Sequence, residues 1–304
     1  MKTKHSLIFT IAAAGICAVL RIMQYCFIID QNGYFRPEST AHTMLIYILY
    51  AVMALAAVTA LIIMFVGSRE RVGAEVFKNN SSGFLMLGAA VLMTVDFGIC
   101  AGKMFQTSVP DIAALFELLT AIYFAVLGYK ILSGSRIGGA AVIGLFAPIF
   151  VIVFAVTEFF GSFEKVHVSE TKFNMLAICA MALFVVTVTL LFAGNAVSKK
   201  RLTAVCMLYT VIASPAAVAG LAALIAGKIT AESPVRFTVK ALTEIVFMVL
   251  AITAMARTDR CIISTDKEET QNEAESNSET AGENLTDIIS DITNDNNKGE
   301  DCNG

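Results

Sequence analysis

The chain has 304 residues, of which 57% are hydrophobic and 15% charged, and its mean hydropathy is +0.72. Soluble domains are about 45–50% apolar and about 25% charged, so this composition excludes an ordinary water-soluble domain. Residues 259–304 hold 13 acidic and 3 basic side chains, whereas residues 1–258 hold 12 acidic and 19 basic side chains. The acidic pI of about 5.7 therefore describes the tail and indicates nothing about a partner of the body.

Apolar segments long enough to cross a bilayer recur along the body of the chain. A spanning helix needs about 20 mainly apolar residues, and eight such segments are separated by charged residues, glycine, proline or asparagine. In chain order they are residues 7–29, 42–66, 83–101, 110–132, 138–159, 173–194, 202–227 and 237–256. The sequence predicts an all-α integral membrane bundle of about eight transmembrane helices over residues 1–258. A disordered acidic tail over residues 259–304 follows it.

Lysine and arginine in the short loops predict the orientation, because basic loops stay on the cytoplasmic side. With the N-terminus inside, the inner segments near the membrane hold 13 of these residues and the outer loops hold six. An even number of spans places the acidic tail inside as well. We therefore expect a multi-pass protein of the plasma membrane, in contact with the lipid bilayer, with both termini in the cytoplasm.

Chemistry-bearing residue types form no catalytic or metal-binding pattern. The seven cysteines all lie outside the predicted outer loops, with a bridge between Cys26 and Cys100 as an alternative, and the three histidines pair with no ligand at metal-binding spacing. Phosphate loops, dinucleotide fingerprints, nucleophile elbows and basic stripes for nucleic acid are missing too. We predict no cofactor, no metal, no nucleic-acid partner and no enzymatic activity.

Ionisable residues inside the predicted spans are the strongest functional signal, because each costs about 2.5–3.5 kcal/mol to insert. The ionisable residues are Arg21, Asp96, Glu117, Lys240 and Glu244. Gln24 lies one helical turn after Arg21 and belongs to the same candidate site. In the predicted orientation all of them lie in the outer half of the membrane. We expect a polar pocket there that binds a small solute or ion. The alternative is that they fix helix packing or extend to the outer interface.

Spacing within the helices suggests how these charges pair. Lys240 and Glu244 are four residues apart and can pair within one helix. Arg21 is then expected to pair across the bundle with Asp96 or Glu117.

Two predicted spans contain proline, which removes a backbone hydrogen bond and predicts a kink. They are the fifth span, with Pro148, and the seventh, with Pro215. Broken helices line solute sites in transporters, although kinks are also ordinary in helical bundles. The two four-span halves share no internal repeat, which weakens the transporter interpretation.

One part of the tail has helical periodicity. Apolar residues recur at i, i+3, i+4 and i+7, namely Leu285, Ile288, Ile289 and Ile292, and would form one apolar face of a short acidic helix. This face is a candidate docking site for a cytoplasmic protein or for the basic inner loops. The alternative is a solvated tail with no docking role.

The first span and the loop after it carry a family resemblance. The run Arg-Ile-Met-Gln at residues 21–24 and the run Ile-Asp-Gln-Asn-Gly-Tyr-Phe at residues 29–35 resemble the opening of uncharacterised polytopic membrane proteins of Gram-positive anaerobic bacteria. Those proteins carry an Arg near the end of the first span and an Asp-x-x-x-Gly-aromatic turn, whereas here two residues separate Asp30 from Gly33. The resemblance implies a multi-spanning architecture and a membrane location, and no activity.

The sequence supports three classes of function, in order of preference. The first is a small-solute or ion transporter-like or binding bundle, because polar residues from several helices converge in the outer half. The second is a non-transporting membrane sensor or assembly scaffold that acts through its cytoplasmic tail. The third is a membrane-embedded enzyme with Asp96 and Glu117 as acid and base, for which a nucleophile or metal set is missing.

Overall fold

The computed structural model describes residues 3–27, 40–67, 70–107, 112–135, 144–161, 169–227 and 234–263. The chain divides into two units, Met1–Ile262 and Ile263–Gly304, and the helical bundle belongs to the first. The tail residues predicted to dock a partner, Leu285, Ile288, Ile289 and Ile292, lie outside the described residues.

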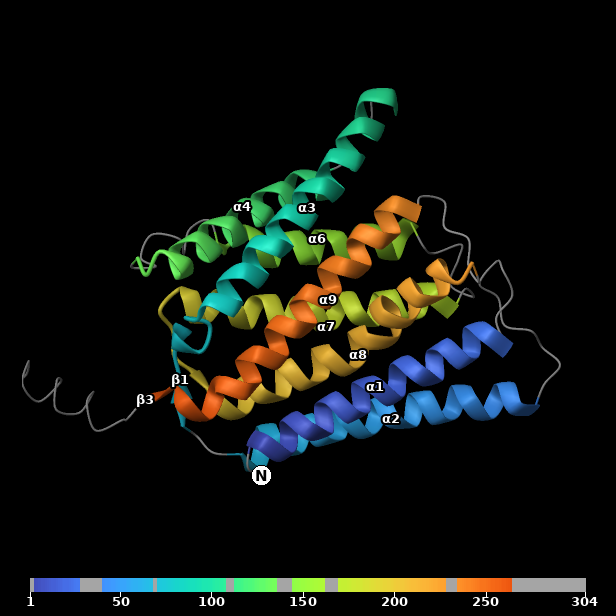
Figure 1. Cartoon of the computed structure of the whole chain (residues 1–304), viewed down its shortest axis with the longest axis horizontal. Coiled ribbons are helices and arrows are strands. Elements are labelled where there is room, and N and C mark those ends of the chain that lie inside the picture. The colour runs from blue at the N-terminus through green and yellow to red at the C-terminus, as the bar shows by residue number, and fades with distance from the viewer. Residues whose placement is uncertain are drawn as a thin grey trace, which may run out of the picture. The chain divides into compact units, whose positions relative to one another are not determined.

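Long α-helices account for most of the described residues (Figure 1). They are α1 (Thr3–Phe27), α2 (Thr40–Val66), α3 (Asn80–Thr107), α4 (Ile112–Leu132), α6 (Phe146–Gly161), α7 (Ser169–Phe192), α8 (Lys199–Ile225) and α9 (Pro234–Arg257). Seven of these described helices are long and apolar enough to cross a membrane. At 1.5 Å per residue, even the 21-residue α4 is about 32 Å long, which matches the hydrocarbon core of about 30 Å. The predicted all-α bundle of about eight helices is confirmed.

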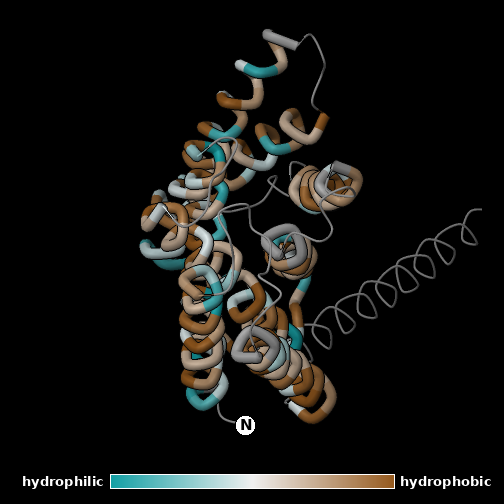
Figure 2. The backbone as a smooth tube through the Cα atoms, turned by 90° about the vertical axis from the view of Figure 1, so that its right-hand side faces the viewer, coloured by the Kyte–Doolittle hydropathy of each residue, from teal (hydrophilic) through white to brown (hydrophobic). Residues whose placement is uncertain are grey.

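Hydrophobic residues occupy most of the length of the described helices, as contact with lipid requires (Figure 2). Large hydrophobic side chains are exposed on α1 and α2, for example Ile8, Leu61 and Phe65. In water such a surface would drive aggregation, whereas lipid tails solvate it. The described helices therefore form a multi-pass membrane-embedded bundle.

Helix α6 departs from the predicted fifth span, for which the sequence indicates residues 138–159 with a kink at Pro148. The helix begins at Phe146, after a turn at Leu145, and residues 136–143 lie outside the described residues. Pro148 thus occupies the first turn of α6. In a continuous helix the proline ring would clash with the carbonyl group four residues earlier, here that of Gly144. Proline also has no N–H to donate to that carbonyl, and both effects explain the break at that point. The 16 residues of α6 extend about 24 Å.

Helix α8 continues through its own proline and uses a neighbouring serine to compensate. Pro215 has no N–H, so the carbonyl of Val211 loses its ordinary helical donor. The Ser214 hydroxyl lies 3.0 Å from that carbonyl oxygen and 3.0 Å from the carbonyl oxygen of Ala14 on α1. The single O–H of Ser214 lies within hydrogen-bond distance of both carbonyl oxygens, so the two share one donor that links α8 to α1.

The helices pack around α8 and α9. Helix α8 contacts α1, α2, α7 and α9, while α9 also contacts α3, and α6 lies between α4 and α7. Helices α3 and α4 approach closely where Gly128 meets Gly83, because a Cβ at Gly128 would lie 2.8 Å from the Gly83 carbonyl oxygen. Small residues permit this approach in membrane bundles. The contact aligns two helices that both carry buried carboxylates.

Short segments join the helices at the end of the bundle where α1 begins (Figure 1). Strand β1 (Arg71–Val72) pairs antiparallel with β2 (Val197–Ser198), with Val72 opposite Val197. One-turn helices η1 (Ala74–Val76) and η3 (Thr258–Arg260) and the short strand β3 (Ile262–Ile263) complete the described elements. The Lys199 ammonium lies 3.0 Å from Glu70 Oε2 and 2.7 Å from Asp259 Oδ1. This ion triad links the segment before α3, the first residue of α8 and the segment after α9.

The six described cysteines are free thiols, and Cys26 and Cys100, the alternative pair for a bridge, are among them. Cys302 lies outside the described residues.

Candidate functional site

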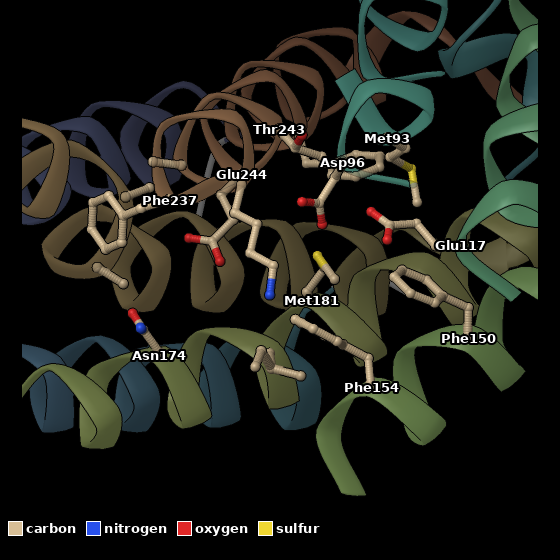
Figure 3. Close-up of a pocket in the computed structure, with 16 residues that line it drawn as sticks. Met93, Asp96, Glu117, Phe150, Phe154, Asn174, Met181, Phe237, Thr243 and Glu244 are labelled. Atoms are coloured by element: carbon tan, nitrogen blue, oxygen red, sulfur yellow. The ribbon is translucent and has the colours of Figure 1, made fainter. Parts of the chain in front are cut away.

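A pocket opens among α3, α4, α6, α7, α8 and α9, in the half of the bundle farther from the β1–β2 pair (Figure 3). Its polar lining residues are Asp96, Glu117, Asn174, Lys240, Thr243 and Glu244, and its aromatic and thioether lining residues are Met93, Phe150, Phe154, Met181, Phe237 and Phe247. The cavity volume is about 100 Å³. One water needs about 10–15 Å³ on this measure, so the cavity holds several waters or one small solute.

Asp96, on α3, is held by an arginine from α9. Its side chain is 2% exposed, and Arg236 Nε lies 3.1 Å from its Oδ1. The guanidinium is 27% exposed and so reaches toward the end of the bundle while it neutralises a deeply buried carboxylate. This pair fixes α3 against α9 beside the pocket.

Glu117 enters the pocket from α4 and points toward Asp96 (Figure 3). Glu117 is 8% exposed. Its largest electrostatic interaction with another charged group is with Asp96, and smaller ones are with Lys240 and Arg236. Asp96 Oδ2 accepts a hydrogen bond from none of the described donors. The pocket therefore holds two carboxyl groups from different helices next to one another.

Two further charged groups come from consecutive turns of α9. Lys240 Nζ lies 4.4 Å from the centroid of the Phe154 ring, a cation–π arrangement. Glu244 follows four residues later and interacts electrostatically with Lys240. The Tyr209 hydroxyl of α8 donates a hydrogen bond of 3.2 Å to the backbone carbonyl of Glu244. Lys240 and Glu244 therefore interact electrostatically along one helix face, and their ion pair stays a prediction from the spacing.

The remaining two predicted site residues form a separate cluster on α1. Arg21 Nη1 donates to Gln24 Oε1 at 2.9 Å, and Nη2 donates to the Tyr25 hydroxyl at 3.3 Å. The guanidinium carbon lies 4.6 Å from the centroid of the Tyr25 ring and 4.3 Å from that of Phe173 on α7. Both Arg21 and Gln24 are fully buried, and neither lines the pocket.

The structure thus brings together four of the six predicted site residues, Asp96, Glu117, Lys240 and Glu244. The sequence predicts that Arg21 pairs with Asp96 or Glu117, but the arginine that contacts Asp96 is Arg236. The sequence alone places Arg236 in an outer loop, because the apolar run begins at residue 237. The missed signal is Pro234, since proline favours the first position of a helix and α9 begins there.

Within the described part of the chain, no three His, Cys, Asp or Glu side chains are placed to bind a metal ion together. The lining residues also contain no Ser, Cys or His that would serve as a strong nucleophile. The arrangement suits reversible binding of a small polar or charged solute.

Comparison with protein-family models, curated proteins and solved structures finds no match to this chain. The fold and composition define its class, a multi-pass α-helical membrane protein. The resemblance of its first span and loop to polytopic proteins of Gram-positive anaerobic bacteria stays a prediction. The pocket is therefore the feature from which a function can be inferred.

Proposed function

We propose that this protein is a small-solute or ion transporter-like or binding bundle of the plasma membrane. The observation that carries the proposal is the convergence of three carboxyl groups, a lysine and an asparagine from α3, α4, α7 and α9 on one cavity inside a lipid-exposed bundle. Charged groups at that depth are costly and mark solute or ion sites in membrane proteins.

A purely structural role for these charges fits the geometry less well. Ion pairs that only fix packing fill the space between helices, as Asp96 and Arg236 do. Beside that pair, however, Glu117 and Glu244 border a cavity of about 100 Å³. A polar cavity between helices costs packing contacts unless water or a solute fills it. The presence of such a cavity beside the charged residues therefore supports a binding role.

Helix α8 contributes Ala216 and Ala217 to the pocket, directly after Pro215. The helix is continuous through this proline, so small side chains and not an unwound backbone shape this wall. The basic residues of the segments around β1 and β2 favour a cytoplasmic location for that end, which would leave the pocket in the outer half of the membrane.

Thermal unfolding of the purified protein in detergent tests the proposal. A panel of ions, amino acids and sugars is added to the wild type, to Glu117→Gln and to Glu75→Gln, a matched control that removes an exposed carboxylate on η1. A ligand at 100 times its Kd stabilises the folded state by about 2.7 kcal/mol. We expect one class of solute to stabilise the wild type and the control, but not Glu117→Gln.

Absence of any stabilising solute would count against the proposal. The alternative of a non-transporting sensor or assembly scaffold would then be preferred. It predicts that deletion of residues 264–304, which spares the Asp259 ion pair and β3, abolishes capture of a cytoplasmic protein partner and leaves unfolding of the bundle unchanged.

A further inference from the structure

We propose that the pocket binds one small organic ammonium ion in exchange for one proton held between Asp96 and Glu117. The inference rests on the proposed function and names the solute class of the same site. It follows from the contact of the two carboxyl groups, the balance of charge in the pocket, and the chemistry of the pocket walls.

The two carboxyl groups need a proton between them when the pocket is empty. Asp96 Oδ1 is occupied by Arg236, Oδ2 receives no hydrogen bond from the described donors, and the Glu117 carboxyl points toward it. Two ionised carboxylates offer only acceptors and repel each other. One proton turns the contact into a hydrogen bond and removes one buried negative charge, as in known carboxyl pairs.

The charge balance of the pocket gives the stoichiometry. The ionisable groups that line it or contact its charges are Asp96 and Cys100 on α3, Glu117 on α4, Tyr209 on α8, and Arg236, Lys240 and Glu244 on α9. The described lining residues from α6 and α7 are not ionisable. With the thiol and phenol neutral, three carboxyl groups face two cations. One shared proton makes the set neutral, and its loss leaves one negative charge that a monovalent cation compensates.

The walls favour an alkylammonium over a metal ion. Phe150, Phe154 and Phe247 present aromatic surface, and Met93 and Met181 add polarizable thioethers. Proteins hold hard divalent ions with several carboxylates, and no three His, Cys, Asp or Glu side chains of the described residues are placed to hold a metal ion together. Lys240 covers the Phe154 ring at 4.4 Å, so Phe150 and Phe247 are the aromatic lining residues that a second ammonium ion would contact. A cavity of about 100 Å³ admits methylammonium and excludes a bulky amine.

The exchange forms and breaks no covalent bond between heavy atoms. The ammonium ion enters with its positive charge, and the proton leaves the Asp96–Glu117 pair for water. The total charge of the pocket is the same before and after. Affinity for the cation should therefore rise with pH, by up to about tenfold per unit while the pair is protonated.

Proton release on addition of methylammonium chloride tests the inference. The purified protein is held in detergent with minimal buffer near pH 7.5, and a pH-indicator dye reports released protons. We expect about one proton per wild-type molecule at saturation, the same for Glu75→Gln, and none for Glu117→Gln. N-methylglucamine chloride at equal concentration should release none, because it is too large for the cavity.

A second variant keeps the test decisive if Glu117→Gln folds poorly. Phe150→Leu keeps all charged groups and the Lys240–Phe154 contact but removes an aromatic face of the pocket, so proton release should persist while the methylammonium affinity falls about threefold to thirtyfold. Sodium chloride that releases the proton as well as methylammonium would overturn the solute class. Stabilisation by neutral or anionic solutes without proton release would overturn the exchange and leave the proposed function standing. Failure of every solute to bind would overturn both.

Discussion

Helices α3 and α4 approach each other closely at Gly128, and a single methyl group there should separate them. A Cβ at this position would lie 2.8 Å from the Gly83 carbonyl oxygen, 2.8 Å from Leu87 Cγ and 3.0 Å from the Leu87 backbone nitrogen. Ordinary contacts to a Cβ are 3.4–4 Å. Two of the three obstructing atoms belong to the backbone, so a rotamer change cannot relieve the clash, and α3 must withdraw by roughly half an ångström.

Gly128→Ala is therefore expected to lower the free energy of unfolding by about 1–3 kcal/mol, the usual cost of overpacking. Gly88→Ala is the matched control on α3, because nothing lies within 4 Å of its Cβ. The control should leave the free energy of unfolding unchanged or raise it by up to about 1 kcal/mol. Denaturant unfolding followed by helical circular dichroism in one detergent measures both. Equal losses in the two variants would refute the packing argument.

Three further comparisons test individual polar contacts. Arg236→Gln should lower the free energy of unfolding by about 3 kcal/mol, because it leaves the buried Asp96 carboxylate without its cation. Asp96→Asn should lower it less, because the arginine left unpaired is more exposed, and denaturant unfolding of both variants measures the difference. Ser214→Ala should cost about 0.5–1.5 kcal/mol, since it removes a hydrogen bond between helices. Thr157→Ala, an exposed hydroxyl bonded within α6, should cost less in the same assay. Lys199→Ala should cost about 1 kcal/mol at low ionic strength, and a loss that persists in 1 M salt would contradict a surface ion triad.

The spans could be predicted from the sequence because bilayer thickness fixes the length of an apolar helix. The predicted spans 42–66 and 237–256 correspond to α2 (Thr40–Val66) and α9 (Pro234–Arg257). Depth along the helix axis could also be predicted, since it follows from counting residues at 1.5 Å each. That is why Asp96 and Glu117, expected at the same depth, line one pocket.

The neighbours of each helix could not be predicted in this way. Apolar faces pack against many partners, and a sequence does not state which helix faces which. Arg21 lies at a depth similar to that of Asp96, but α1 packs on α8 and places the guanidinium against Phe173 of α7. Pro148 predicts a kink when the whole apolar run is taken as one helix, although the clash of its ring with a carbonyl four residues earlier already favours a helix start there.

Cation-driven proton movement in sealed vesicles tests the central claim most directly. The protein is reconstituted into liposomes that contain a pH-sensitive dye, and tetramethylammonium chloride is added outside. This quaternary ion has no neutral form that crosses lipid unaided. The exchange predicts that the vesicle interior becomes alkaline faster with the wild type than with Glu117→Gln or in protein-free vesicles. An interior pH that changes equally slowly in all three would contradict transport through the Asp96–Glu117 pocket.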